Sequence, residues 1–209
     1  MRLFDLFESC TDDTRKQDAV RSTPDFDISI GRFADEQGQL VADFPIGYDD
    51  LVSKIRQYTT ASSLNSALLS GRKLSTKLQS QYDALMELKD LRDTLSKEHH
   101  VYSGIGVFDP KSIMKNDIFQ TGSFISASIN IAVASKNNNF KRKEDADDHL
   151  LHFILPKGYR GCFYIGPYST SPEELEIVIF PNERFRLISS KTRKLDDAIR
   201  HIYTLKPVK

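Results

Sequence analysis

Apolar residues follow two different periods along the chain. Between residues 48 and 95 they recur at spacings of three and four, which is typical of amphipathic helices that bury one face. After residue 100 they form short runs and alternations rich in β-branched residues, which favour strands. Helices followed by strands predict an α+β domain rather than a doubly wound parallel sheet.

Three helices are expected in the first part. The first begins near Asp49, and the second is short and stops at Gly71, because glycine commonly follows the last residue of a helix. The third carries a leucine stripe from Leu74 to Leu95, which we expect to pack on a sheet. His99 and His100 are expected to end this helix, where cations interact favourably with its dipole.

Strands are predicted over residues 101–107, 123–128, 150–155, 162–165, 175–180, 185–188 and 199–205, with a short helix over 129–134. We expect these strands to form a mixed or antiparallel core of two sheets. Residues 46–209 would make up one domain. Residues 1–45 are polar and rich in turn residues, and they predict a loosely ordered N-terminal extension.

The composition narrows the function classes. The 209 residues carry a formal net charge of +0, so no overall field attracts nucleic acid or an anionic membrane. The sequence contains no apolar run of 18 residues, so no membrane span is predicted, and the acidic N-terminus does not resemble a secretory signal. Cys10 and Cys162 lie far apart without zinc-site spacing, which favours a reducing compartment. His149 and His152 lack a third ligand at a suitable spacing, so no metal is expected.

Two carboxylates stand at the start of the most apolar run. Glu174 and Glu176 flank Leu175, and Ile177 to Phe180 follow directly. On a strand, residues i and i+2 share a face and lie roughly 7 Å apart, so the two side chains would lie side by side at the mouth of a loop. Because like charges repel, the pair is either a solvated strand start or a pair with separate electrostatic and acid–base roles.

Three motifs follow the helices in order: Tyr102-Ser103-Gly104, Ser126-Ala127-Ser128 in the strand from Phe124, and Glu174-Leu175-Glu176. Leu155-Pro156-Lys157-Gly158 stands between the last two. This order resembles the mono-ADP-ribosyltransferases of the R-S-E class over about residues 48–206. That class includes clostridial-type toxins, vertebrate ecto-enzymes and the Alt and Mod proteins of T-even phages, and the chain is most similar to the phage proteins.

The resemblance implies NAD as a substrate, no metal, and a role for each motif residue. Glu176 would stabilise the oxocarbenium-like transition state of nicotinamide–ribose cleavage. Glu174 would orient or deprotonate the acceptor, and a Glu at this position indicates arginine, whose pKa above about 12 demands a base. Ser126 would support Glu176. The NAD site would comprise Tyr102, Ser103, Gly104, Ser126 and Ser128.

The first motif departs from the family pattern. Ser103 stands where the family has an arginine that holds an NAD phosphate, so the charge and the bidentate fork are missing. Three interpretations remain open. Another cation holds the phosphate, with His100, Lys157 and Arg160 as candidates; NAD binds weakly; or transferase activity has been lost.

The leading hypothesis is an effector that transfers ADP-ribose from NAD to arginine on host proteins and releases nicotinamide in the host cytoplasm. Leu6-Phe7-Glu8 fits the cleavage motif of phage proteins that are carried in the virion and injected, but three residues match easily by chance and a frayed terminus is the favoured interpretation. The alternatives are a catalytically degenerate protein of the same fold that acts by binding, and an NAD glycohydrolase. The basic triplet 141–143 is offset by nearby acids, so nucleic-acid binding is not expected.

Overall fold

The computed structural model describes residues 48–60, 63–91, 95, 98–106, 111, 114–129, 131–136, 148–165, 169–171, 174–195 and 198–208. Among the described residues, the helices α4 (Tyr48–Thr60), α5 (Ser63–Leu69) and α6 (Thr76–Leu91) precede the strands, and α7 (Ile131–Lys136) lies between strands. The strands are β1 (His99–Gly106), β2 (Ile118–Gln120), β3 (Ile125–Ser128), β4 (Asp148–Leu155), β5 (Cys162–Tyr164), β6 (Glu176–Ile179), β7 (Arg184–Leu195) and β8 (Ala198–Pro207). The predicted extension over residues 1–45, with Leu6-Phe7-Glu8 and Cys10, lies outside the described residues.

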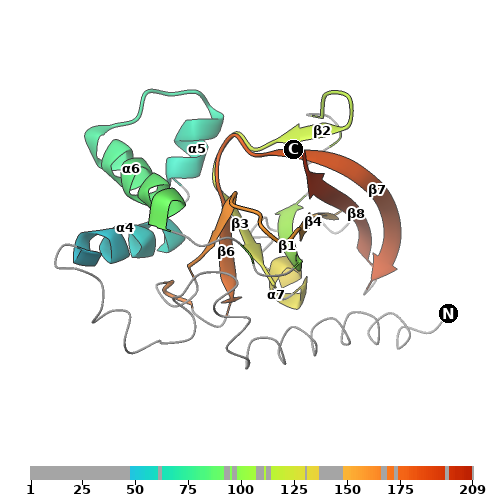
Figure 1. The fold of residues 1–209 in the computed structure, drawn as a ribbon. Helices are drawn as coiled ribbons and strands as arrows, with labels where there is room; N and C mark the ends of the chain where they lie inside the picture. Colours follow the sequence, from blue (N-terminus) through green and yellow to red (C-terminus); the bar gives the residue numbers. More distant parts are fainter. Residues whose placement is uncertain are drawn as a thin grey trace.

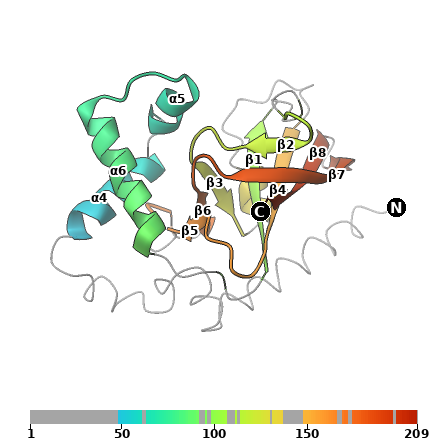
Figure 2. The same cartoon turned by 45° about the horizontal axis from the view of Figure 1, so that its top comes forward.

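The eight strands of the described residues form one hydrogen-bonded sheet in the order β2-β7-β8-β4-β1-β3-β6-β5 (Figures 1 and 2). The pair β4–β8 is parallel and the other neighbouring pairs are antiparallel, so the predicted α+β class with a mixed sheet is confirmed. The two expected sheets are joined into one, because β1 pairs with β4 on one side and, through Tyr102 and Ser128, with β3 on the other.

Two apolar cores lie on opposite faces of β3, β5 and β6. Ile177 and Ile179 belong to one core with residues of β1, β4, β7 and β8, whereas Val178 and Phe180 belong to the other with α4, α5 and α6. Strands that are buried on both faces read as continuous apolar runs, which explains the sequence from Ile177 to Phe180. Figures 1 and 2 show the three helices gathered on one side of the molecule.

The leucine stripe divides between these two cores. Leu85 and Leu88 of α6 pack on the helix side, as predicted, but Leu95 lies in the core on the other side of the sheet. A single helix cannot reach both. The backbone of Leu95 instead bonds to the β4–β5 turn, with Gly158 N donating to Leu95 O at 2.7 Å. The expectation that His99 and His100 end the helix is therefore wrong, and both residues belong to β1.

The end of α5 follows the prediction. Gly71 has a φ of 62°, Arg72 N donates to Ala67 O at 3.2 Å and Gly71 N donates to Leu68 O at 3.1 Å. This pair of hydrogen bonds closes a helix on a left-handed residue, which glycine adopts without a steric penalty. No helix in the described part of the chain combines the length and the hydropathy of a membrane span.

Candidate active site

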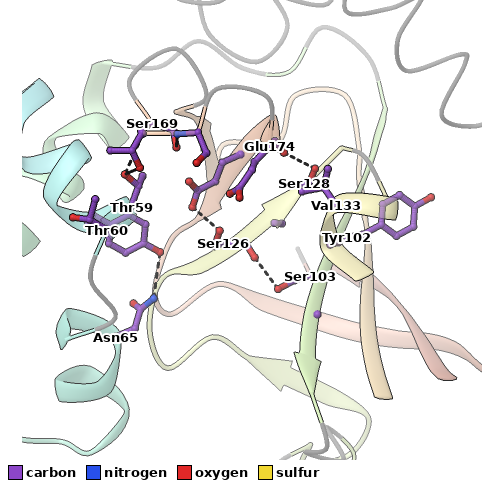
Figure 3. A pocket seen from close by; sticks show the side chains of 17 residues that line it. Thr59, Thr60, Asn65, Tyr102, Ser103, Ser126, Ser128, Val133, Ser169 and Glu174 are labelled. Atoms are coloured by element: carbon purple, nitrogen blue, oxygen red, sulfur yellow. Dashed lines mark hydrogen bonds between the residues drawn. The ribbon is translucent and has the colours of Figure 1, made fainter. Parts of the chain in front are cut away.

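A pocket of about 540 Å³ lies between the helices α4 and α5 and the strands β1 and β3 (Figure 3). Its walls also include α7 and the segment before β6. Every site residue that the three sequence motifs predict lines this pocket: Tyr102, Ser103, Gly104, Ser126, Ser128, Glu174 and Glu176.

Strand register brings the three motifs together. Tyr102 of β1 pairs with Ser128 of β3, and Ser128 pairs with Glu176 of β6, so one residue from each motif stands in a single row across the sheet. Directly opposed residues of neighbouring strands lie about 5 Å apart, so residues distant in sequence share one small site.

Glu176 is the most buried acid of the pocket, with 6% of its surface exposed. Ser126 Oγ donates a hydrogen bond of 2.5 Å to Glu176 Oε1, and Ser169 also bonds its side chain. Burial raises the pKa of Glu176, the bond from Ser126 opposes this rise, and the charge of Glu174 adds to it. The site therefore holds a carboxylate whose proton affinity is increased by its surroundings.

The sequence pattern predicts Glu174 on a strand together with Glu176, but in the structure Glu174 lies before the strand. The strand β6 begins at Glu176, and Leu175 between the two acids has a φ of 51°, in the left-handed region. A bulky residue rarely adopts this conformation, which costs roughly 1–3 kcal/mol. Leu175 is held there because its side chain is buried, and because Ser128 Oγ donates to Glu174 O at 2.7 Å. The turn still directs both carboxylates to the pocket.

The hydroxyl groups of Ser103 and Ser128 donate hydrogen bonds to backbone carbonyl groups. Ser103 Oγ donates to Ser126 O at 2.7 Å and is 6% exposed, so it ties β1 to β3 beneath the pocket. Ser128 fixes the turn that carries Glu174. Both residues therefore position the two glutamates, in addition to lining the pocket.

Tyr102 contributes to the pocket differently from the prediction of a ligand-binding side chain. Its ring stacks on His152 with 4.7 Å between centroids and 14° between planes. Figure 3 shows this ring pointing away from Ser126 and Glu174. The side chain therefore packs on the sheet beside α7, where it joins Ala134 and Leu150 in a small apolar cluster.

The described lining residues include no lysine, arginine or histidine. The three candidates to replace the missing arginine lie elsewhere: Lys157 and Arg160 are exposed in the β4–β5 turn, and His100 Nδ1 is 2.9 Å from His152 Nε2. His149 and His152 are three positions apart on β4 and therefore point to opposite faces of the sheet, and His149 Nδ1 is 3.0 Å from Tyr203 Oη. Within the described residues, no group of three or more His, Cys, Asp or Glu side chains could hold a metal.

Two residues of the helices complete the pocket and carry no signal in the sequence. Asn65 Nδ2 donates to Tyr58 Oη at 3.2 Å, and Asn65 Oδ1 is buried without a hydrogen-bond partner among the described residues. Burial and the charge of Glu176 raise the pKa of Tyr58, which therefore stays protonated. Tyr58 occupies a core position of an amphipathic helix, so only its tertiary contact with the pocket distinguishes it from other core aromatics.

Solved structures with the same fold are ADP-ribosyltransferases. Plx2a, an ADP-ribosyltransferase toxin from Paenibacillus larvae, matches with a TM-score of 0.62 and 15% identity, over 83% of this chain and 92% of the toxin chain. Exoenzyme S from Pseudomonas aeruginosa, bound to carba-NAD and to human 14-3-3 protein beta, has a TM-score of 0.62 and 14% identity, over 90% and 87% of the two chains.

C3stau2 from S. aureus, solved with NAD, has a TM-score of 0.60 and 18% identity, over 80% of this chain and 89% of its own. No protein-family model and no curated protein matches the sequence. At these identities the likeness shows the fold, and the chain has the ADP-ribosyltransferase fold.

Proposed function

We propose that this protein is an NAD-dependent mono-ADP-ribosyltransferase that modifies arginine side chains of a protein and releases nicotinamide. The observation that carries the proposal is the buried Glu176, held by Ser126, with Glu174 on the adjoining turn of the same pocket. The fold supports it, since solved structures of this fold include complexes with NAD and carba-NAD.

The pocket fits the nicotinamide–ribose half of NAD. A volume of about 540 Å³ is in the range of pockets that bury small ligands. The carboxylate of Glu176 can accept from a ribose hydroxyl, and the unpartnered Asn65 Oδ1 can accept from a ribose hydroxyl or an amide N–H. No described lining residue offers a cation to the pyrophosphate, so that half of NAD depends on hydrogen bonds or on residues outside the described set.

The residues of the site divide the chemistry between them. NAD supplies a glycosidic bond whose cleavage places positive charge on the ribose. Glu176 would supply the fixed negative charge that stabilises the ribose in the transition state, and Ser126 holds one of its oxygens in place. Glu174 would take the proton that the guanidinium must lose as its nitrogen replaces nicotinamide on the sugar carbon.

Two finer parts of the proposal rest on the sequence resemblance to phage transferases. They are an acceptor on a host protein, and action in the host cytoplasm after delivery in the virion. The lack of a described cation in the pocket favours a second candidate, a protein of this fold that binds a partner without catalysis.

Incubation of the full-length protein with NAD labelled in its adenylate half and a bacterial lysate tests these functions. We expect labelled protein bands, release of nicotinamide, and loss of label in neutral hydroxylamine, which cleaves the arginine linkage. Nicotinamide release without labelled protein or labelled agmatine, a small guanidine, would identify a glycohydrolase. If no nicotinamide is released and calorimetry detects no binding of NAD, the result would favour the second candidate, a protein of this fold that binds a partner without catalysis.

The pH dependence of nicotinamide release should shift in opposite directions in two variants. Glu176 must be ionised, so its pKa sets the acid limb of kcat/KM. Ser126→Ala removes a hydrogen bond that lowers this pKa, so the limb moves to higher pH. Glu174→Gln removes a charge that raises it, so the limb moves to lower pH. Rates across a pH series, with the exposed Ser190→Ala as control, measure the shifts. Limbs that move together would contradict the assignment to Glu176.

A further inference from the structure

Strand register collects exposed basic side chains on one face of β7 and β8. Arg186 pairs directly with Lys206, and directly opposed residues share a face of the sheet. Arg184 precedes Arg186 by two positions on β7 and therefore lies on the same face. All three side chains are exposed.

A bulge keeps a fourth cation on this face. The register shifts between Leu187 and Ser189, so that Ser189 pairs with Thr204, two residues before Lys206. Lys191 follows Ser189 by two positions, and so it also lies on the face of Arg186. We call Arg184, Arg186, Lys191 and Lys206 the basic face.

The basic face is not neutralised by the described part of the chain. None of its four side chains forms an ion pair with a described carboxylate. Glu183, beside Arg184, is occupied by Lys89 at 3.4 Å and by Tyr159, whose hydroxyl donates at 3.0 Å. Asp117 lies beside β7, where its carbonyl oxygen accepts from Leu187 N at 2.8 Å, and Glu98 lies beside His100, 3.5 Å from its Nε2.

The neighbouring strand β4 carries a histidine next to Thr204. His152 of β4 pairs with Thr204 and thus shares the face. Burial lowers its pKa to about 4, and the charges of His100 and Lys191 act in the same direction. Lys191 therefore approaches His152 from β7, which agrees with a positive field over this part of the sheet.

An apolar side chain interrupts the basic face. Ile188, the residue inserted at the bulge, is 52% exposed and stands between Arg186 and Lys191 along β7. Figures 1 and 2 show α4, α5 and α6 on the other side of the molecule from β7, so these helices do not cover it. Arginine is enriched at protein interfaces, so a face that presents two arginines beside an exposed isoleucine can contact another protein.

We propose that the basic face, with Ile188 at its centre, docks an acidic surface of the acceptor protein. This inference rests on the proposed transferase function and identifies the kind of acceptor. The strands β8 and β7 stand two and three positions from β1, which lines the pocket, so the basic face lies about 10–14 Å from it at about 4.8 Å per strand. An interface of about 800 Å² per partner spans more than this distance. A docked protein would therefore reach both places.

Charge complementarity favours an acidic protein over a nucleic acid. Surfaces that bind single strands combine cations with exposed aromatic rings on which bases stack. The described residues of this face expose an isoleucine instead, and Tyr102 is buried beside α7.

A triple charge reversal, R184E with R186E and K206E, tests the docking. We expect labelling of lysate proteins to fall about tenfold or more, because reversed charges slow association and repel an acidic partner. Nicotinamide release and labelling of agmatine should stay within about twofold of wild type, since neither uses the interface. The matched control reverses three exposed cations near α6 and carries R72E, K73E and K77E.

Protein labelling that is unchanged, or that falls equally in the control, would overturn the proposal. The variant with Gln at the same three positions guards against misfolding, and it should show a smaller loss of the same kind. If the wild type releases no nicotinamide, the transferase function fails, and docking is then judged by binding alone. Fluorescence anisotropy with an alternating Glu–Leu peptide should show binding at low salt that the triple reversal removes and the control keeps. Tighter binding of a single-stranded oligonucleotide, or no peptide binding, would overturn docking of an acidic protein.

Discussion

Replacement of Glu176 by glutamine is expected to slow nicotinamide release from NAD by about two to three orders of magnitude, the usual cost of losing one group that stabilises transition-state charge. Glutamine keeps the shape of the side chain, and Ser126 Oγ can still bond its amide. The variant therefore removes the charge with little change in the pocket. The rate of nicotinamide release with saturating NAD measures the effect.

The same substitution should raise the thermal midpoint at neutral pH. Burial raises the pKa of Glu176 in the folded state, so between the unfolded and folded pKa values the folded protein binds more protons. Stability contributed by this residue is therefore present at low pH and is lost as pH rises through that window. Glutamine cannot ionise, so its advantage should be largest above the window and should vanish below it. Thermal unfolding by circular dichroism at several pH values measures this.

Glu183→Gln is the matched control. Glu183 is a partly buried carboxylate outside the pocket, and it pairs with Lys89 and accepts from Tyr159. Its loss should lower the thermal midpoint and leave nicotinamide release unchanged, the reverse of the Glu176 result on both measurements. If Glu176→Gln lost stability and kept activity, Glu176 would be a structural acid and the proposed function would lose its main support.

Much of the candidate site could be predicted from sequence because most of its residues belong to short motifs that lie on strands. Ser126, Ser128 and Glu176 lie on β3 and β6, and register alone brings them together. The left-handed turn at Leu175 could not be predicted, because leucine carries no preference for it. Tertiary contacts impose this conformation: a buried side chain, and a hydrogen bond from Ser128 to the preceding carbonyl.

Other parts of the fold were missed where tertiary contacts override local pattern. Leu95 continues the helical period of the leucine stripe but is drawn into the opposite core, so the helix stops earlier. The strand β2 has only three residues, too few for an alternation to appear. Its signal is the pair Asn116 and Asp117, both with positive φ, which form the tight turn that precedes it. Asn65 reaches the pocket through helix packing, which no local pattern records.

Replacement of Glu174 by glutamine is expected to separate the two halves of the reaction. Transfer to agmatine or to protein arginine should fall by about two orders of magnitude or more, the range for loss of a positioned general base. Nicotinamide release with water as acceptor should change by less than about threefold, because water is not a guanidinium and Glu176 remains in place. The backbone of the turn is unaffected, since Ser128 bonds the carbonyl of residue 174 and not its side chain.

The measurement is the ratio of labelled agmatine to free ADP-ribose from one reaction, followed across pH. In wild type the ratio should exceed that of the variant throughout. The exposed Glu87→Gln on α6 serves as control and should keep the wild-type ratio. A parallel loss of both products would place Glu174 in cleavage of the glycosidic bond instead of acceptor activation. An unchanged ratio would mean that another group takes the guanidinium proton, and Tyr58, whose raised pKa keeps it protonated, could not be that group.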